Sequence, residues 1–473
     1  MSAFRMADLL IHGGTIVTAN RTFDASLLID KGRIVSVSKS AHMRARSRVN
    51  AKGLYILPGL IDTHVHFRDP GMTHKEDFVT GTRSAAKGGV TTILDMPTNL
   101  PTVTSRKRFL EKLNAVKTKS IVDFGLYAGA SVANLPGLHD LAETGAIAFK
   151  SYMVAPPPER AYEYEGTFVT DTASLYRLME GVRAVGGLLC LHAECDSIVR
   201  YLTERLKSEG RRDALAHAES RPQFSETEAV SEALLLSESV GTRVHLLHLS
   251  ARGAVDLLRY WKKNGSSSTA ETCPQYLFLT KETLRQQGPY AKCNPPLRDE
   301  SDRKALWKGI SDGTIDIVAS DHAPHSKAEK DAGVQDIWKA PAGMPGVETR
   351  LPLLLTEAAR GRIRLQDIVR LCATRPAEIF GLYPKKGQIA IGSDADLVLV
   401  DLDKEWILSR DQIETKGRET FVFEGWQVKG KVVATYLRGN LVVEEDKVLA
   451  KPGSGEFVKS KRLQTRAQDS SLA

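Results

Sequence analysis

The chain of 473 residues is 42% apolar and 26% charged, an ordinary balance for a globular protein that buries a large core. Its net charge of +8 comes from scattered lysines and arginines, which argues against nucleic-acid binding and favours an anionic small substrate. Because no apolar run reaches ~18 residues and the first residues lack a secretory signal, we expect a cytoplasmic protein that does not enter the membrane.

The cysteine pattern fits a reducing compartment. The cysteines are odd in number and never form a Cys-x-x-Cys motif: Cys190, Cys195, Cys273, Cys293 and Cys372. We therefore expect neither structural disulfides nor a zinc site built from thiolates.

Short β-rich runs occur at both ends of the chain. Asp30-Lys31-Gly32 separates two such runs in the manner of a hairpin turn, and a run of the same character returns at residues 395–401. These runs predict one small β-sandwich domain built from residues 1–58 and 385–450. Residues 451–473 are expected to form a mobile C-terminal tail.

The middle of the chain, residues 59–384, alternates strand-like and helix-like segments, the pattern of an α/β fold with a parallel sheet. Helical windows such as 75–87 and 226–240 end at glycines. The eight strand candidates are 60–67, 90–96, 122–129, 146–153, 188–194, 243–250, 269–277 and 315–320. Eight such units predict a TIM-type (β/α)8 barrel, whose active site forms at the C-terminal ends of its strands.

The first predicted barrel strand ends in a row of polar side chains. Side chains alternate faces along a strand, so His64, His66 and Arg68 point the same way. Buried imidazoles and a buried guanidinium need partners, which a metal ion and an anion would supply. Two histidines satisfied by hydrogen bonds at a strand end would explain this motif alone equally well.

Other predicted strands also end in polar groups. Lys150 lies near the end of the fourth strand, His192 near the end of the fifth, and Asp321 just after the eighth. In the sixth, His245 and His248 are three residues apart and cannot both face inward, and His248 is favoured because it lies nearer the strand end. Polar groups at five strand ends on one barrel rim indicate a functional site.

These residue types suit metal-assisted hydrolysis of an amide. Four histidines and an aspartate can bind zinc, manganese or cobalt, and two ions would need a bridging anion. A neutral Lys150 amine supplies such an anion when it adds carbon dioxide to form a carbamate, although an ordinary lysine cation fits its position as well. A metal-bound hydroxide would attack the carbonyl while Asp321 transfers the proton. Arg68 would hold a substrate carboxylate, with His325 and Asn294 as further donors.

The His-x-His strand end and the later polar positions resemble the cyclic amidohydrolases of the amidohydrolase superfamily over nearly the whole chain. The resemblance implies two divalent metal ions, with zinc the first choice, and a small-molecule substrate. The implied roles are His64 and His66 on the first ion, His192 and His248 on the second, carbamylated Lys150 as the bridge, and Asp321 as ligand and catalytic base. We also expect a homo-oligomer, either a dimer or a tetramer.

Three motifs are similar to dihydroorotases: residues 62–70, 292–298 and 319–325. This resemblance implies that Arg68 and His325 hold a substrate carboxylate and that Asn294 contacts the ring. Asn99 corresponds to the carboxylate-binding asparagine of that family but stands one residue late after Met96-Pro97. We therefore predict a dihydroorotase of pyrimidine biosynthesis, which interconverts L-dihydroorotate and N-carbamoyl-L-aspartate.

Other segments resemble hydantoinases and allantoinases: residues 162–168, 271–276 and 338–348. The alternative function is a hydantoinase, dihydropyrimidinase or allantoinase that acts on a neutral cyclic ureide. Dihydroorotase is preferred because a neutral ring would offer the buried guanidinium of Arg68 no partner. A catalytically silent relative with a structural role is a further alternative, disfavoured because every metal-ligand position is filled.

Overall fold

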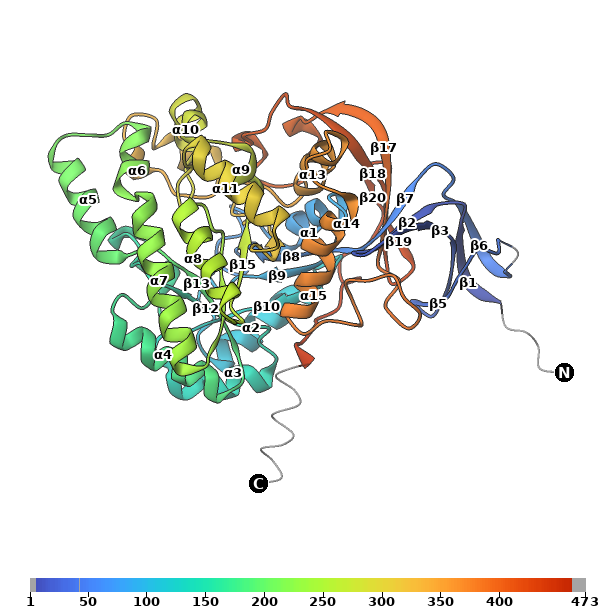
Figure 1. Cartoon of the computed structure of the whole chain (residues 1–473), viewed down its shortest axis with the longest axis horizontal. Coiled ribbons are helices and arrows are strands. Elements are labelled where there is room, and N and C mark those ends of the chain that lie inside the picture. The colour runs from blue at the N-terminus through green and yellow to red at the C-terminus, as the bar shows by residue number, and fades with distance from the viewer. Residues whose placement is uncertain (1–5, 42, 462–473) are drawn as a thin grey trace, which may run out of the picture.

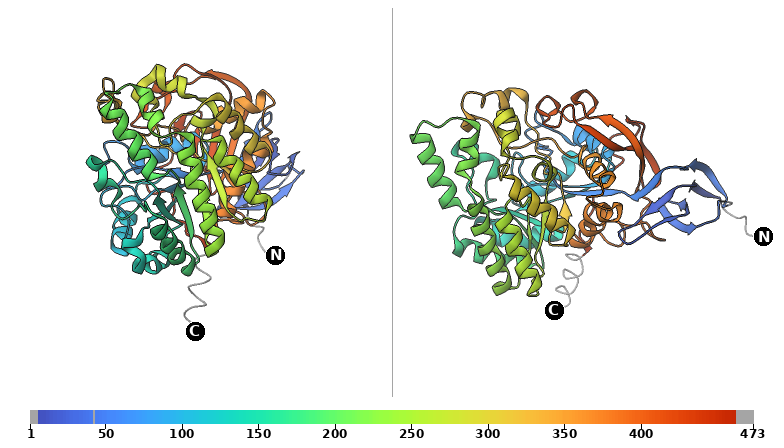
Figure 2. Two further views of the ribbon diagram at one scale, coloured as in Figure 1. Left: turned by 60° about the vertical axis from the view of Figure 1, so that its left-hand side comes forward. Right: turned by 45° about the horizontal axis from the view of Figure 1, so that its top comes forward.

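The computed structural model describes residues 6–41 and 43–461 of the chain. An α/β body contains the middle of the chain, and a β domain projects from one side of it (Figure 1). The N-terminal strands form the far end of that projection, as the right-hand view of Figure 2 shows. None of the helices in the described part of the chain has the length and apolar composition needed to span a bilayer.

The β domain consists of two sheets. One runs in the order β5 (Arg33–Ser38), β4 (Ser26–Asp30), β1 (Ala7–His12) and β6 (Ala45–Asn50). The other runs in the order β20 (Lys447–Val448), β19 (Asn440–Glu444), β18 (Gln427–Leu437), β17 (Leu397–Ile407), β7 (Tyr55–Pro58), β2 (Thr15–Val17) and β3 (Thr22–Asp24). Since Leu397 pairs with Pro58 and Val400 with Tyr55, strands from both parts of the chain share this second sheet.

The α/β body is built on parallel strands. One sheet contains β8 (Leu60–Val65), β9 (Val90–Asp95) and β10 (Asp123–Leu126). The other contains β11 (Ala128–Gly129), β12 (Phe149–Tyr152), β13 (Leu188–His192), β14 (Arg243–Leu246), β15 (Thr269–Thr272) and β16 (Ile317–Val318). Backbone hydrogen bonds join the two sheets at two places: Ile147 donates to the carbonyl of Leu126 at 2.9 Å, and His66 donates to that of His322 at 2.8 Å. Each of the eight predicted segments contains at least one of these strands.

The seventh strand is shorter than the sequence pattern predicted. β15 ends at Thr272, and Pro274 begins helix α9 (Pro274–Phe278). Proline lacks the N–H that a β-ladder requires and is well suited to the first turn of a helix, which explains why the strand stops. The last polar side chain of this strand that faces the site is therefore Glu271.

Helices alternate with the parallel strands, and the windows predicted at 75–87 and 226–240 correspond to α1 and α7. The helices are α1 (Phe78–Lys87), α2 (Arg106–Val116), α3 (Leu138–Thr144), α4 (Thr172–Ala184), α5 (Asp196–Ser208), α6 (Ala214–Ser220), α7 (Gln223–Val240), α8 (Arg252–Lys263), α10 (Lys281–Gln287), α11 (Glu300–Ser311), α12 (Lys327–Asp331), α13 (Arg350–Ala359), α14 (Leu365–Val369) and α15 (Arg375–Ile379). Shorter turns are η1 (Val132–Gly137), η2 (Pro158–Tyr164), η3 (Gly288–Ala291), η4 (Ile337–Lys339), η5 (Arg370–Thr374), η6 (Arg410–Gln412) and η7 (Arg418–Thr420). Asp77 caps α1 by accepting from the Thr80 N–H, and Gly241 ends α7 at a positive φ that glycine adopts easily.

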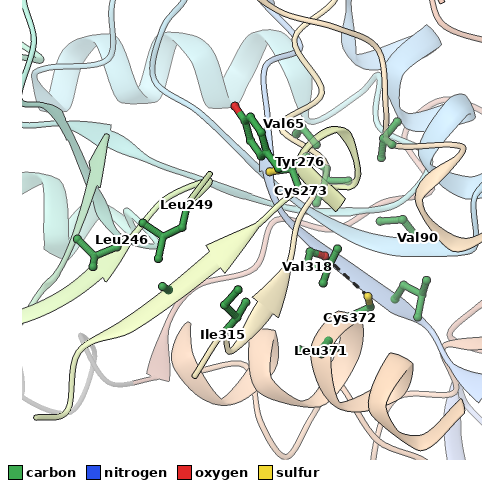
Figure 3. Packing of buried hydrophobic residues seen from close by; sticks show 14 of the residues in the cluster. Val65, Val90, Leu246, Leu249, Cys273, Tyr276, Ile315, Val318, Leu371 and Cys372 are labelled. Atoms are coloured by element: carbon green, nitrogen blue, oxygen red, sulfur yellow. Dashed lines mark hydrogen bonds between the residues drawn. The ribbon is translucent and has the colours of Figure 1, made fainter. Parts of the chain in front are cut away.

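The body packs around a continuous apolar core. Val65 on β8, Leu246 on β14 and Val318 on β16 lie within the cluster that Figure 3 shows. Cys273 and Cys372 belong to the same cluster, and all five cysteines of the chain are unpaired. Parallel strands buried on both faces need such apolar side chains. Polar side chains at the strand ends therefore stand out against an apolar background.

Part of the segment that the sequence assigned to a mobile tail packs against the body. Phe124 on β10 donates to the carbonyl of Glu456 and accepts from Val458, both at 2.9 Å, and its ring lies 5.7 Å from that of Phe457. The tail prediction is therefore corrected for residues 451–461, because these contacts pack a partly buried aromatic side chain against the core, which the polar composition of the segment obscured. Residues 462–473 lie outside the described residues.

A buried ion network lies at the start of β10. The amine of Lys386 lies 2.6, 3.2 and 2.7 Å from carboxylate oxygens of Asp123, Asp394 and Asp396. Arg438 also pairs with Asp123. Since these carboxylates already have cationic partners, we assign them a structural role that ties β10 to the segment before β17.

Candidate active site

A cavity of about 730 Å³ lies at the C-terminal ends of the parallel strands. The six predicted metal ligands all line it: His64, His66, Lys150, His192, His248 and Asp321. Arg68 and Asn294 line it as well. The structure thus brings together polar groups that are far apart in the sequence, at the face where barrel enzymes carry their active sites.

His64 and His66 meet Asp321 at one point. The two Nε2 atoms lie 3.2 Å apart, and they lie 3.2 and 3.5 Å from Oδ1 of Asp321. The other nitrogen of each ring is held from behind, His64 Nδ1 by Glu271 at 2.6 Å and His66 Nδ1 by Thr98 at 2.8 Å. Both rings are therefore oriented with Nε2 toward the cavity.

Glu271 fixes the tautomer of His64. Although burial raises the pKa of a carboxyl, the neighbouring charge of His64 and the hydrogen bonds from the histidines hold the pKa of Glu271 well below its usual range. A carboxylate only accepts, so Nδ1 of His64 donates to it, and in the neutral form of the ring Nε2 then presents a lone pair. Burial raises the pKa of Asp321 to about 6, so above that pH its carboxylate is a second acceptor at the same point. Converging acceptors fit a cation.

His192 and His248 form a second pair. Nδ1 of His192 lies 3.0 Å from Nε2 of His248, while its Nε2 lies 2.7 Å from Glu194, which also pairs with Arg221. Burial lowers the pKa of His192 to about 4 despite this carboxylate, so the ring is neutral at pH 7. His245, by contrast, contacts Glu271 and lies away from the cavity lining. Neutral imidazoles that face one another are suited to a second cation.

Lys150 lines the same cavity as these two pairs of histidines. Its side chain is 0% exposed, and its Nζ has no hydrogen-bond partner among the described residues. The ring centroid of Tyr152 lies 4.1 Å from Nζ. Burial lowers the pKa of Lys150 to about 7, so about half of the amine is neutral at that pH. A buried, unbonded and partly neutral amine fits the predicted carbamate.

Three cavity residues have strained backbone conformations. Arg68, His248 and Asp321 have φ angles of +61°, +38° and +48°. Non-glycine residues in this region cost of order 1–3 kcal/mol each, and such strain is concentrated at functional sites. The fold therefore holds these three side chains in place at a cost in stability.

Arg68 has a partner that the sequence pattern did not reveal. Its Nη1 lies 3.6 Å from Oε2 of Glu163, whose side chain is 1% exposed. Glu163 belongs to η2, in the loop that follows β12, and it also lines the cavity. The expectation that only a substrate anion could compensate this guanidinium is therefore wrong.

Asn99 lies outside the cavity lining. Its side-chain amide donates to the carbonyl of Pro101 and accepts from Lys112, each at 3.1 Å. Thr98, one residue earlier, is the one that reaches His66. The predicted contact of Asn99 with substrate is corrected: the one-residue offset after Met96-Pro97 turns its amide into the protein.

His325 and Asn294 differ in their access to the cavity. The His325 ring is fully buried, and its Nε2 donates to the carbonyl of Ala342 at 3.1 Å instead of lining the cavity. The predicted direct contact of His325 with a carboxylate is therefore corrected for this arrangement of the loop around Gly343. Asn294 does line the cavity, and its Oδ1 is without a hydrogen-bond partner in the described part of the chain.

Four supporting residues were not predicted from the sequence: Thr98, Glu163, Glu194 and Glu271. Glu194 and Glu271 stand in predicted buried strands, where an acidic side chain signals a partner. Glu163 carries no comparable signal, because Glu165 lies in the same loop and only the fold distinguishes them.

Comparison with known proteins identifies the class. The model of the Amidohydrolase family matches residues 55–442, and the chain belongs to the amidohydrolase family. It is accordingly a hydrolase, and its fold is the amidohydrolase fold.

The names of individual relatives refer to different cyclic substrates. The solved structure of an L-hydantoinase (dihydropyrimidinase) from Arthrobacter aurescens has a TM-score of 0.92 at 34% identity, covering 96% of this chain and 100% of that one. An allantoinase of Deinococcus radiodurans is 37% identical over 94% of this chain and 97% of its own length. A dihydroorotase of Methanosarcina acetivorans is 37% identical over 96% of each chain. These similarities confirm the predicted resemblance to cyclic amidohydrolases.

Proposed function

We propose that the protein hydrolyses a neutral cyclic ureide, a ring of the hydantoin, dihydropyrimidine or allantoin type. The observation that carries this proposal is the pairing of Arg68 with Glu163 inside the cavity. With a carboxylate already beside it, the guanidinium does not require an anionic substrate for charge compensation. Similarity to an L-hydantoinase and to an allantoinase supports the same substrate class.

The residues that would hold two divalent ions are His64 and His66 for one ion, His192 and His248 for the other, and Asp321 with carbamylated Lys150 beside both. When bound, such ions polarise the scissile carbonyl and lower the pKa of a water, and zinc suits these nitrogen and oxygen donors. Asp321 acts as the base, taking a proton from the attacking water and delivering it to the leaving ring nitrogen. We further propose that the eight strand segments close into a complete barrel around these groups.

Dihydroorotase activity is the second candidate. Nε and Nη1 of Arg68 make no hydrogen bond to any described residue, and the separation of 3.6 Å from Glu163 is longer than a hydrogen bond. Donors of this kind are suited to a substrate carboxylate. The relative named as a dihydroorotase supports this candidate.

Replacing Arg68 with methionine separates the two candidates. We expect kcat/KM for a neutral ring to stay within about 10-fold of wild type, because Arg160 and Lys75 still compensate Glu163. A dihydroorotase would instead lose about 100-fold or more on L-dihydroorotate, since its carboxylate would lose a charged partner. The measurement is steady-state kinetics of both substrates, with Arg205→Met, on the exposed side of α5, as the control. A loss of about 100-fold on every neutral ring would contradict the proposal.

A further inference from the structure

Arg68 belongs to a cluster of charges at the side of the cavity, which contains Arg68, Lys75, Arg160, Glu163 and Glu329. Glu163 is its centre. Its Oε2 lies 3.6 Å from Arg68 Nη1 and its Oε1 lies 3.5 Å from Lys75 Nζ. Both of its oxygens also accept hydrogen bonds from Arg160. One buried carboxylate therefore contacts three cations, and one of them, Lys75, also pairs with Glu329 at 3.1 Å.

Glu163 and Arg68 come from separate elements. Arg68 follows β8, whereas Glu163 lies in η2, a turn of the loop after β12. Although burial raises the pKa of this carboxyl, the hydrogen bonds and charge of Arg160 lower the pKa of Glu163 to about 2, so it is ionised at neutral pH. The loop thus places a permanent negative charge beside the guanidinium at the cavity wall.

We propose that Glu163 is a specificity-determining residue that keeps carboxylated rings out by placing a negative charge beside the unbonded donors of Arg68. This inference rests on the proposed function and deepens it. A substrate carboxylate bound to Arg68 would lie roughly 3 Å from its nitrogens. Glu163 already stands 3.6 Å from the same guanidinium, so two carboxylates would share one cation at close range. Like charges placed side by side in a desolvated pocket disfavour the wrong ligand, and a neutral ring meets no such repulsion.

Removal of the Glu163 charge would leave the donors of Arg68 available to an anion. Nε and Nη1 of Arg68 have no hydrogen-bond partner within the described ranges, so Glu163 neutralises the guanidinium without saturating its donors. Glutamine at position 163 would keep the size of the side chain and a bond to Arg160 while removing the negative charge. Arg68 would then be left as a free anion site.

The test is the substrate preference of Glu163→Gln in the full-length, metal-loaded protein. The ratio of kcat/KM for L-dihydroorotate to that for hydantoin is expected to rise about 100-fold, mainly through a lower KM for L-dihydroorotate. The double variant Arg68→Met/Glu163→Gln should lose this gain, because the new anion site is Arg68 itself. Glu165→Gln is the matched control: it lies two residues away, is 65% exposed and pairs with Arg108, so its ratio should remain that of wild type.

The outcomes separate this inference from the function on which it rests. A wild-type protein that prefers L-dihydroorotate would overturn both. If the wild-type protein prefers a neutral ring and Glu163→Gln leaves the ratio of the two kcat/KM values unchanged, the inference alone is overturned. The inference is also overturned if the ratio rises in the double variant as much as in Glu163→Gln. If Glu163→Gln does not fold, Glu163→Asp is the second variant. Its shorter side chain moves the carboxylate away from Arg68 but keeps a negative charge to pair with Arg160. A rise in the ratio of about 10-fold then supports the inference, and no rise overturns it.

Discussion

Replacing Lys150 with alanine is expected to remove bound metal and hydrolase activity together. The amine is buried, lacks a hydrogen-bond partner among described residues and has a pKa near 7, so its neutral form can attack carbon dioxide. In that step the nitrogen bonds to carbon, one C=O π bond of carbon dioxide breaks, and the proton passes to water, which would leave an anionic carbamate in the cavity that the four histidines line. Without this anion two cations would repel each other at short range. We expect metal content to fall below two ions per chain and kcat/KM to fall about 1,000-fold or more.

Added short carboxylic acids test the carbamate itself. Acetate or propionate can enter the space that the lysine side chain leaves and supply the missing carboxylate, so partial recovery of metal content and activity is expected. Lys107→Ala, on the exposed surface of α2, is the control and should bind metal as wild type does. Two tightly bound ions in Lys150→Ala would show that no carbamate bridge exists.

Replacing Asp321 with asparagine is expected to lower kcat about 1,000-fold or more on every cyclic substrate. Its carboxylate lies 3.2 and 3.5 Å from the inner nitrogens of His64 and His66, where it can take a proton from an attacking water. An amide of the same shape cannot accept that proton. Circular dichroism should show an unchanged fold, because the side chain is nearly isosteric.

Asp256→Asn is the matched control for this change. Asp256 lies on α8, is half exposed and pairs with the exposed Arg252 and the partly buried Arg259, outside the cavity lining, so the kcat of this variant should equal that of wild type. If Asp321→Asn retained kcat within about 10-fold of wild type, another group would have to act as the base.

Alternation along strands accounts for the parts that the sequence predicted well. The eight strand segments and the inward direction of His64 on β8 follow from local periodicity and from the rule that barrel sites form at strand ends. His66 and Arg68 lie beyond the end of β8 and still line the same cavity. His248 was chosen over His245 on the same ground, and the structure places His248 at the cavity and His245 against Glu271. Local pattern is sufficient where a residue's direction depends only on its own strand.

Contacts between distant segments account for the rest. Glu271 is 207 residues from His64, and Glu163 reaches Arg68 only through the course of the loop after β12. No spacing rule connects such pairs. For Asn99 the sequence motif was misleading. The residue corresponds to a substrate-binding position of the dihydroorotases, but because it stands one residue later its side chain contacts Lys112 and does not face the cavity.

The change in predicted substrate has the same origin. Arg68 viewed alone indicates an anionic ring, since a buried guanidinium without a partner is costly. Glu163 supplies that partner within the protein. Because the charge of Arg68 is then compensated without a substrate anion, the arrangement favours a neutral ring. A specificity argument based on one buried charge therefore requires knowledge of every charge around it.

The most direct test of the proposed function is the steady-state kcat/KM of zinc-loaded protein measured in parallel on hydantoin, dihydrouracil, allantoin and L-dihydroorotate. We predict that one of the three neutral rings exceeds L-dihydroorotate by about 100-fold or more, the discrimination expected when Glu163 repels a substrate carboxylate. A preference of that size for L-dihydroorotate would contradict this account and would establish Arg68 as the partner of the substrate carboxylate.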